Sequence, residues 1–281
     1  MAIKGALRVI EAFAETEHRL LACDYRGTLT EEITASMRHA DAVLLMLHGG
    51  EGEGGGLQQA LEQAGIYHYT GTDPRGAALA LDKARAKACV AKAGVPVAAG
   101  GIWQPQEQPP CVKLPAIAKP LLGGSSVGLF KIERADELKN FAPHEPMLLE
   151  EYLSGREFTV GVLGDRALPA VEIIPHGGMY DYQHKYTPGA TAELCPAPID
   201  AEKAALLKNL ALASFRALGL RDFARIDFKE NAAGVPCFLE ANTLPGMTET
   251  SLLPLAARAA GLSFTALCTY MAECAARRRG I

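Results

Sequence analysis

Two carboxylates and an amide stand in the last third of the chain, in two stretches whose residues alternate as in β-strands. Asp227 follows Arg225 at a spacing of two, and Asn242 follows Glu240 at the same spacing. Alternate residues of a strand point to one face, so a hairpin of ordinary register across a loop at residues 231–234 brings all four side chains together. Such oxygen ligands suit a hard cation such as Mg²⁺ better than zinc. The alternative is an ion pair between Arg225 and Glu240 on neighbouring strands.

A glycine-rich stretch of sequence Gly-Gly-Ser-Ser-Val-Gly occupies residues 123–128. The backbone amides of such a stretch can approach phosphate oxygens closely, although it lacks the Lys-Ser/Thr ending of a Walker A loop. Lys119 ends the apolar segment before it and is costly to bury unless an anion meets it. Lys83 and Lys185 are further candidates for phosphate contacts. The alternatives are a flexible linker and ordinary solvated lysines.

Three other positions have the character of ligand contacts. Residues 148–153 are typical of a strand that leaves one lobe and enters the next, where ligands commonly bind, and its backbone could pair with an adenine edge. A glycine- and proline-containing loop follows Asn242 and runs into a helix N-terminus near Ser251, where free amides attract a carboxylate. A simple N-cap is the alternative there. His48 ends a predicted parallel strand, where α/β sheets present ligand-contacting groups.

The elements that must position these residues fall into three predicted units, over residues 1–72, 73–151 and 152–281. In the first unit helix and strand signals alternate, which predicts a parallel sheet covered by helices. Its predicted helices begin near Ile3 and Gly56, and its predicted strands cover residues 20–24, 42–47 and 66–69.

The second unit begins with a predicted long helix over residues 74–92, with proline in its first turn and Gly94 just beyond its end. Short β-rich segments and a helix over residues 135–141 complete it. The third unit is predicted to contain a hairpin over residues 157–174, a polar segment 175–198, a helix 201–218, strands 223–230 and 236–241, and two closing helices. Long aperiodic segments in compact domains are usually lids or disordered, so residues 175–198 are the candidate lid.

The composition favours a globular cytoplasmic enzyme. The chain has 281 residues, of which 49% are hydrophobic and 21% charged, and no apolar run is long enough to cross a membrane. The formal net charge of −4 argues against a nucleic-acid partner, and the basic run at residues 277–279 is interpreted as favourable charge at a helix end. Seven cysteines without a CxxC pair argue against a disulfide framework and against structural zinc.

Seven motifs, taken in order, resemble the D-alanine:D-alanine ligase family of ATP-grasp enzymes. They are Leu47-His-Gly with Gly56-Leu-Gln, Leu81-Asp-Lys83, Lys119-Pro with Gly-Ser-Ser-Val-Gly, Ser154-Gly-Arg-Glu-Phe-Thr-Val, Tyr180-Asp-Tyr-Gln-His-Lys-Tyr186, Arg225-Ile-Asp, and Glu240-Ala-Asn-Thr-Leu-Pro-Gly-Met-Thr. The resemblance implies an α/β (α+β) fold of the ATP-grasp type, built of three lobes with a shortened N-terminal parallel-sheet lobe.

The resemblance also implies a role for each candidate residue, including Glu150 and Glu157, which their spacing alone does not distinguish from exposed carboxylates. The implied ATP contacts are Lys83, Lys119, Ser126, Glu150, Glu151, Tyr152, Leu153, Glu157 and Lys185, with residues 150–153 at the adenine and Glu157 at the ribose. Two Mg²⁺ ions, or Mn²⁺, would be bound by Asp227, Glu240 and Asn242. The implied catalytic residues are Arg225 and the amide of Gly246, which stabilise an oxyanion, and Ser125. Substrates would be bound by His48, Tyr186, Ser251 and Leu252, of which the last two take the carboxylate of the second substrate.

The implied reaction is the ATP-dependent joining of a carboxylate and an amine through an acyl phosphate. Two D-alanine molecules would give D-alanyl-D-alanine, a peptidoglycan precursor, and the implied assembly is a homodimer built through the first lobe. One alternative is an ATP-grasp ligase of a specialised pathway that joins a different acid and amine. Another is an ATP-binding homologue without turnover, which the retention of Arg225 and of the metal-binding trio disfavours.

The sequence departs from the family pattern at its front. Family members begin with a strand and a Gly-Gly-x-Ser-x-Glu-x-x-Ser segment, whose glutamate receives the ammonium group of the first substrate and contacts the lid through a tyrosine and a serine. This sequence starts in the following helix, although Tyr186 and Ser125 match the two lid partners. Three explanations stay open: Glu51 or Glu53 replaces that glutamate, the first substrate has no ammonium group, or the sequence is a shortened form of the protein.

Overall fold

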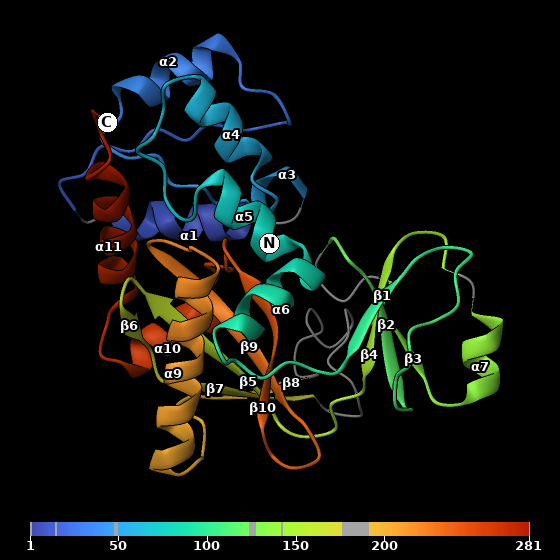
Figure 1. The fold of residues 1–281 in the computed structure, drawn as a ribbon. Coiled ribbons are helices and arrows are strands. Elements are labelled where there is room, and N and C mark those ends of the chain that lie inside the picture. The colour runs from blue at the N-terminus through green and yellow to red at the C-terminus, as the bar shows by residue number, and fades with distance from the viewer. Residues whose placement is uncertain are drawn as a thin grey trace.

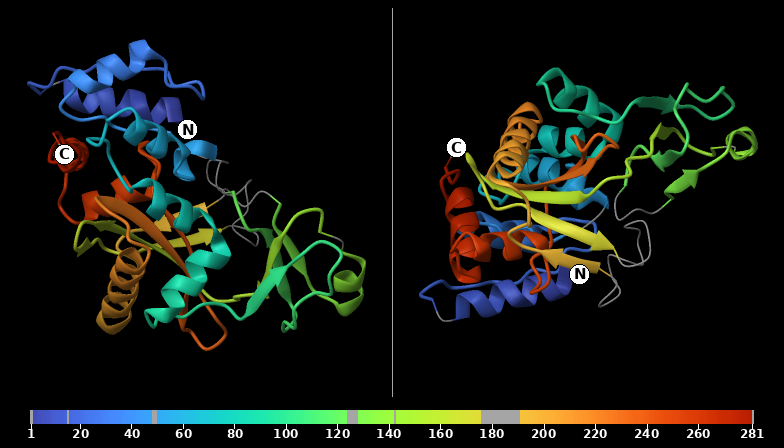
Figure 2. Two further views of the ribbon diagram at one scale, coloured as in Figure 1. Left: turned by 45° about the horizontal axis from the view of Figure 1, so that its top comes forward. Right: turned by 90° about the horizontal axis from the view of Figure 1, so that it is seen from below.

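The computed structural model describes residues 2–14, 16–47, 50–123, 128–141, 143–175 and 191–280, without the side chains of residues 50 and 51. Within this part of the chain a helical N-terminal region, a small four-stranded sheet and a larger six-stranded sheet follow one another (Figure 1). The small sheet stands to one side of the main body in both views of Figure 2.

Helices dominate the N-terminal region. They are α1 (Ala2–Ala14), α2 (Glu31–His39), α3 (Gly50–Glu53) and α4 (Gly56–Gln63). Helix α1 packs its buried side chains Val9 and Phe13 against the main body. The helices predicted to begin near Ile3 and Gly56 are therefore confirmed.

The three strands predicted for this region are reduced to one isolated parallel bridge, between Val43 and Tyr69. Residues 20–24 form no strand, and Leu21 among them is exposed. β-propensity produces a strand only where a neighbouring strand supplies hydrogen-bond partners. In the described residues no such neighbour lies beside residues 20–24, so the prediction of a strand there is wrong.

The long helix predicted over residues 74–92 is divided at Asp82 into α5 (Pro74–Leu81) and α6 (Lys83–Lys92). The backbone of Asp82 is extended, and its carboxylate accepts a hydrogen bond from the amide of Arg85. Asp82 thus caps the second helix, as aspartate does at many helix N-termini. The division places Lys83 at the first position of α6 instead of in the middle of a continuous helix.

The small sheet is antiparallel, with strand order β1-β4-β2-β3. Its strands are β1 (Gly100–Trp103), β2 (Ala116–Pro120), β3 (Phe130–Ile132) and β4 (Met147–Glu151), and α7 (Ala135–Asn140) follows β3. Strand β1 approaches β4 very closely, because a Cβ atom on Gly100 would lie 2.2 Å from the carbonyl oxygen of Leu149. Glycine at this position therefore lets β1 pair with β4 beside Glu150.

The larger sheet has strand order β10-β9-β5-β7-β8, with β6 also paired to β5. Its strands are β5 (Glu157–Leu163), β6 (Arg166–Ala167), β7 (Val171–Pro175), β8 (Thr191–Leu194), β9 (Phe223–Glu230) and β10 (Pro236–Asn242). Strand β8 lies inside the segment 175–198 that was expected to be one long loop. Its antiparallel pairing with β7 supplies backbone hydrogen-bond partners, which the polar sequence of the segment does not predict.

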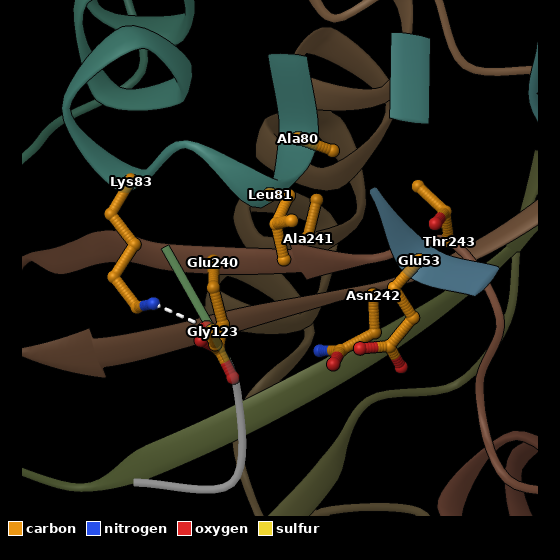
Figure 3. A pocket seen from close by; sticks show the side chains of 9 residues that line it. All are labelled: Glu53, Ala80, Leu81, Lys83, Gly123, Glu240, Ala241, Asn242 and Thr243. Carbon is orange, nitrogen blue, oxygen red and sulfur yellow. Dashed lines mark hydrogen bonds between the residues drawn. The ribbon is translucent and has the colours of Figure 1, made fainter. Parts of the chain in front are cut away.

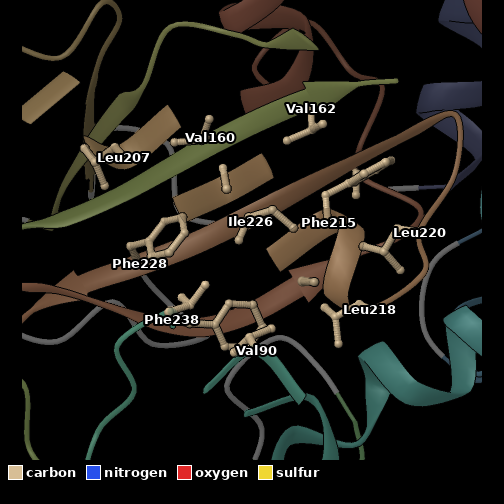
Figure 4. Close-up of a cluster of buried hydrophobic side chains, with 14 of the residues drawn as sticks. Val90, Val160, Val162, Leu207, Phe215, Leu218, Leu220, Ile226, Phe228 and Phe238 are labelled. Carbon is tan, nitrogen blue, oxygen red and sulfur yellow. The ribbon is translucent and has the colours of Figure 1, made fainter. Parts of the chain in front are cut away.

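Helices cover both faces of the larger sheet. On one face, α6 and α9 (Ala201–Ala217) bury the apolar side chains drawn in Figure 4, including Val160, Ile226 and Phe228 from the strands and Phe215 from α9. On the other face lie α1, α10 (Leu252–Ala259) and α11 (Phe264–Ala276). Because alternate residues of β9 are buried beneath α9, Arg225 and Asp227 point to the opposite face.

Among the described residues, no single helix is long and apolar enough to cross a membrane. Helices α10 and α11 meet the length and composition test only as a pair, and they are bent by 107° relative to each other.

The basic run after α11 ties the C-terminal end of the chain to the N-terminal region. Arg278 forms a bidentate pair with Asp222, at 2.8 and 2.6 Å, and Asp222 also accepts a hydrogen bond from the amide of Gly71 at 2.9 Å. Arg278 thus has a specific partner in addition to the helix-end position inferred from its sequence.

Candidate active site

Asp227 stands at the centre of a row of polar side chains on one face of the larger sheet. Its carboxylate accepts two hydrogen bonds from Arg225, both at 2.9 Å, one from Thr159 Oγ1 at 2.6 Å and one from Asn242 Nδ2 at 3.0 Å. Asp227 is only 6% exposed. These bonds fix the orientation of the carboxylate and join residues from β5, β9 and β10.

A β-bulge at Leu239 brings β10 into the register that this row needs. The regular pairing of β10 with β9 runs as far as Phe238. The next pair is Glu240 with Asp227, so Leu239 is an extra residue on β10. If Leu239 were paired in the ladder opposite Asp227, Glu240 would lie opposite Ile226 and would share the buried face of that residue, because residues directly opposite each other point the same way. The bulge therefore places Glu240 on the face of Asp227.

The polar row continues onto β5. Glu157 lies opposite Lys229 in the ladder, and the carboxylate of Glu157 pairs with the Lys229 ammonium group at 2.8 Å. Both side chains are largely buried, with 11% and 14% exposed. The alternative that Glu157 is an ordinary exposed carboxylate is therefore wrong.

Glu240 and Asn242 open onto a pocket that collects groups from distant parts of the chain (Figure 3). Its lining residues are Glu53, Ala80, Leu81, Lys83, Gly123, Glu240, Ala241, Asn242 and Thr243. Lys83, at the start of α6, donates a hydrogen bond to the carbonyl oxygen of Gly123 at 2.6 Å. The pocket thus combines a carboxylate and an amide from the sheet with an ammonium group and the start of the glycine-rich stretch. Oxygen ligands beside a cation are the groups that a phosphate with a bound metal requires.

Glu150 on β4 is buried, with 3% of the residue exposed, and each of its carboxylate oxygens is bonded to a lysine. Lys119 Nζ lies 2.6 Å from Oε1, and the Lys87 ammonium group is bonded to Oε2. The anion expected to meet Lys119 is, in this structure, the Glu150 carboxylate on the neighbouring strand. Burial opposes the charge on Glu150, but the ammonium groups of Lys119 and Lys87 outweigh it and hold the pKa of that carboxyl below its usual range.

The segment that follows Glu150 leads into a small apolar cluster, which consists of Ala98, Leu153 and Cys237 with Leu239 packed against them. The amide of Glu151 donates to the carbonyl oxygen of Ala99 at 2.8 Å, and the amide of Tyr152 donates to that of Pro115 at 2.9 Å. These bonds fix the backbone that the resemblance assigns to the adenine, next to an apolar wall.

Ser251 occupies the N-cap position of α10, but its side chain does not cap the helix. Its Oγ accepts the amide hydrogen of Thr248 at 2.9 Å and is hydrogen-bonded to the Thr248 hydroxyl at 2.8 Å. The simple N-cap interpretation is therefore wrong for this side chain. Leu252 begins α10, and Gly246 lies buried in the loop that leads to it.

Five of the predicted residues lie outside the described part of the chain: His48, Ser125, Ser126, Lys185 and Tyr186. Their roles stay predictions.

Comparison with known proteins decides the family. A family profile described as D-ala D-ala ligase C-terminus matches residues 103–273. A D-alanine–D-alanine ligase from Oleidesulfovibrio alaskensis is 40% identical over 97% of this chain and 91% of its own length. The chain belongs to the D-alanine–D-alanine ligase family. A D-alanine–D-alanine ligase from Methylacidiphilum infernorum is 36% identical over 97% of the chain and 90% of its own length.

Solved structures of the D-alanine–D-alanine ligase family have the same fold. The crystal structure of the Bacillus anthracis enzyme superposes with a TM-score of 0.84 at 28% identity, over 99% of this chain and 93% of that one. A structure of the same enzyme complexed with ATP gives a TM-score of 0.80 at 27% identity, over 99% and 92% of the two chains. The ATP-grasp fold expected from the sequence is thereby confirmed.

Three residues of this D-alanine–D-alanine ligase family member belong to the polar clusters but escaped the sequence analysis. Thr159 and Lys229 bond to Asp227 and Glu157, and Lys87 bonds to Glu150. Strand alternation carried a usable signal for Thr159 and Lys229, since they share the faces of Glu157 and Asp227. Lys87 lies one helical turn after Lys83, which was the only hint of its place.

Glu53, one of the two proposed substitutes for the missing front glutamate of the D-alanine–D-alanine ligase family, lines the pocket beside Asn242 (Figure 3). Its position depends on a close contact between α4 and α5. Gly55 has φ of +89°, and a Cβ atom there would lie 2.4 Å from the carbonyl oxygen of Pro74. Only glycine fits this position without strain, so the turn after Glu53 is fixed against α5.

Proposed function

We propose that the protein joins two D-alanine molecules into D-alanyl-D-alanine, a peptidoglycan precursor, with cleavage of ATP to ADP and phosphate. The observation that carries the proposal is the pocket in which Glu240 and Asn242 meet Lys83 and Gly123. The family membership supplies the substrates, because the relatives that match almost the whole chain are D-alanine–D-alanine ligases. Because the reaction consumes ATP, we place it in the cytoplasm.

The ATP site, in this proposal, extends from the pocket along β4. Lys83 and Lys119 neutralise the phosphates, residues 150–153 lie along the adenine, and Glu157 meets the ribose. The support for this arrangement is the fixed backbone of Glu151 and Tyr152 beside the apolar cluster of Leu153. An apolar wall with a few placed polar groups is typical of nucleotide pockets.

The donor set of the polar row fits Mg²⁺. Among the described residues no three histidine, cysteine, aspartate or glutamate side chains are placed so that together they could hold a metal ion, so the third ligand in this proposal is an amide. Asn242 donates a hydrogen bond from Nδ2 to Asp227 and lines the pocket next to Glu240. Carboxylate and amide oxygens are ligands that Mg²⁺ prefers. We propose that Asp227, Glu240 and Asn242 hold two Mg²⁺ ions, which supply charge neutralisation at the phosphates.

In the first proposed step a carboxylate oxygen of one D-alanine attacks the γ-phosphorus of ATP, the bond to the β-phosphate oxygen breaks, and ADP leaves. Lys83 and Lys119 hold the phosphates in position and neutralise their charge, since the protein forms no covalent bond in phosphoryl transfer of this kind. The product is D-alanyl phosphate.

In the second proposed step the amino group of the other D-alanine attacks the carbonyl carbon of the acyl phosphate. Arg225 and the amide of Gly246 stabilise the oxyanion of the tetrahedral intermediate, and phosphate leaves with the electron pair of the broken bond while the amine loses its proton. Ser251 and the amide of Leu252 hold the carboxylate of this second substrate at the start of α10, where the helix N-terminus favours an anion.

A phosphate-release assay with ATP, Mg²⁺ and a panel of D- and L-amino acids and hydroxy acids tests the proposal. We expect release that depends on D-alanine, with D-alanyl-D-alanine identified by mass spectrometry. Phosphate release with another pair of substrates would show that this pair, and not D-alanine, is the substrate of the enzyme. Absence of release with every member of the panel would favour an ATP-binding protein without turnover.

We further propose a homodimer. Its support is an apolar stripe on the outer side of α1, where Ile3, Leu7 and Ile10 are 76%, 54% and 37% exposed. Sedimentation equilibrium is expected to give twice the mass of the chain, and the mass of one chain at all concentrations would contradict the dimer.

A further inference from the structure

Lys87 contacts Glu150 of the proposed ATP site and does not line the pocket. It is one helical turn beyond Lys83 on α6 and only 5% exposed, and its ammonium group is bonded to Oε2 of Glu150. Lys119 holds the other oxygen of the same carboxylate at 2.6 Å. One buried carboxylate is therefore shared between two lysines.

The charges of this cluster do not balance. Two ammonium groups surround a single carboxylate, and a buried excess charge is costly unless an anion compensates it. Lys119 is the last residue but one of β2, close in sequence to the glycine-rich stretch, and with 9% of the residue exposed it is less buried than Lys87. Lys119 is accordingly the lysine placed to receive an anion, and Lys87 is the one placed to remain with Glu150.

We propose that Lys87 is a positioning residue of the nucleotide site: it neutralises Glu150, so that Lys119 can exchange the carboxylate for a phosphate of ATP. The inference rests on the proposed function, because it takes ATP as the anion. Without Lys87, movement of Lys119 to a phosphate would leave Glu150 buried and unpaired, so Lys119 would be retained by the carboxylate. The loss therefore appears in nucleotide affinity and not in the binding of D-alanine.

The surroundings of Lys87 also make this arrangement dependent on pH. The groups that face it are Lys119 from β2, Glu150 from β4 and Cys237 from β10. Burial and the neighbouring Lys119 ammonium group lower the pKa of Lys87 to about 8, against the attraction of Glu150. As the pH rises through this value Lys87 loses its proton, Glu150 depends on Lys119 alone, and ATP binding weakens.

Equilibrium binding of ATP with Mg²⁺, measured by calorimetry on the full chain, tests the role of Lys87. We expect Lys87→Met to weaken ATP binding by about tenfold at pH 7, with the KM for D-alanine unchanged. Lys92→Met is the matched control, since Lys92 lies exposed on the same helix and should bind ATP as the wild type does. ATP binding by Lys87→Met within about twofold of the wild type would overturn the proposal.

The pH profile of ATP binding separates a positioning role of Lys87 from a merely structural one. Wild-type affinity for ATP is expected to fall between about pH 7 and pH 9, whereas Lys87→Arg, whose guanidinium keeps its proton, should show a flat profile. A flat wild-type profile would overturn the role of Lys87 while the ligase proposal stands. Failure of the wild type to bind ATP at any pH would instead overturn the proposed function itself.

Discussion

Asp227 is the residue that joins Arg225, Thr159 and Asn242 in the polar row. Arg225, Thr159 and Asn242 all donate to its carboxylate, which is 6% exposed. Removal of its charge while its size is kept should therefore disturb the proposed metal site more than the fold.

We expect Asp227→Asn and Glu240→Gln each to abolish Mg²⁺-dependent phosphate release while the circular dichroism spectrum stays that of the wild type. The reason is that an amide is a far weaker ligand than a carboxylate for a hard cation. Glu202→Gln, at an exposed position on α9, is the control and should keep full activity. Loss of the folded state in either site variant would assign the carboxylate to structure instead of metal binding.

Arg225 carries the proposed oxyanion contact. Its guanidinium is held by two bonds to Asp227, so it is pre-oriented before any substrate binds. We expect Arg225→Met to lower kcat by about 10²–10³-fold, or about 3 kcal/mol of barrier, with little change in ATP affinity. Steady-state kinetics measure both quantities, with Arg216→Met on the exposed side of α9 as the control. An unchanged kcat would remove Arg225 from the chemistry.

At the scale of elements, the decisive feature is the single extra residue on β10. The loop between β9 and β10 comprises residues 231–235, one residue more than the four predicted from the sequence. In a regular ladder this extra loop residue would turn Glu240 to the sheet face opposite Asp227. The bulge at Leu239 returns Glu240 to the face of Asp227. The strands themselves were predictable from alternation, but the loop length and the bulge were not, because Leu239 fits the alternating pattern.

Deletion of Leu239 should remove the bulge and leave Glu240 directly after Phe238, opposite Asp227 in a regular ladder. We expect a folded protein that keeps phosphate release, because Glu240 and Asn242 stay on the face of Asp227, and Leu239→Ala should keep it as well. Deletion of Ala233, which shortens the exposed loop and leaves the ladder unchanged, is the control. Loss of turnover in a folded protein after deletion of Leu239, with turnover kept by the control, would show that the register of β10 is not what aligns the site.

Other elements differ from the sequence prediction for equally local reasons. The proline at the start and Gly94 beyond the end predict one helix that runs through Asp82, yet the Asp82 side chain caps α6, and a new helix begins at Lys83. Burial of Glu150 could not be read from the sequence either, because its two lysine partners are contributed by separate elements, α6 and β2.

At the scale of the whole molecule, the pocket exists only because distant segments meet. Glu53 comes from α3, Lys83 from α6, and Glu240 from β10. Motif order made the family predictable, since the residues that bind ligands are tied to short local patterns. The contacts between units depend on pairs of side chains that are far apart in the chain, such as Arg278 with Asp222. A local sequence pattern does not predict such pairs.

The pair of Arg278 and Asp222 should matter for stability, because Asp222 also holds the amide of Gly71 in the N-terminal region. We expect Arg278→Met to lower the free energy of unfolding by about 3 kcal/mol, as loss of one partner of a largely buried pair does. Urea unfolding measures the change, and Arg277→Met, at an exposed position, should stay within about 0.5 kcal/mol of the wild type. Equal stability of the two variants would contradict the role of this pair in joining the C-terminal end of the chain to the N-terminal region.

The central claim is that the pocket forms an acyl phosphate from D-alanine and ATP. Turnover of D-alanine labelled with ¹⁸O in its carboxylate, followed by mass spectrometry of the released phosphate, tests it directly. Attack of the carboxylate on the γ-phosphorus predicts transfer of one ¹⁸O atom to each phosphate released with a dipeptide. Unlabelled phosphate would show that the carboxylate is not the attacking group and would contradict the account.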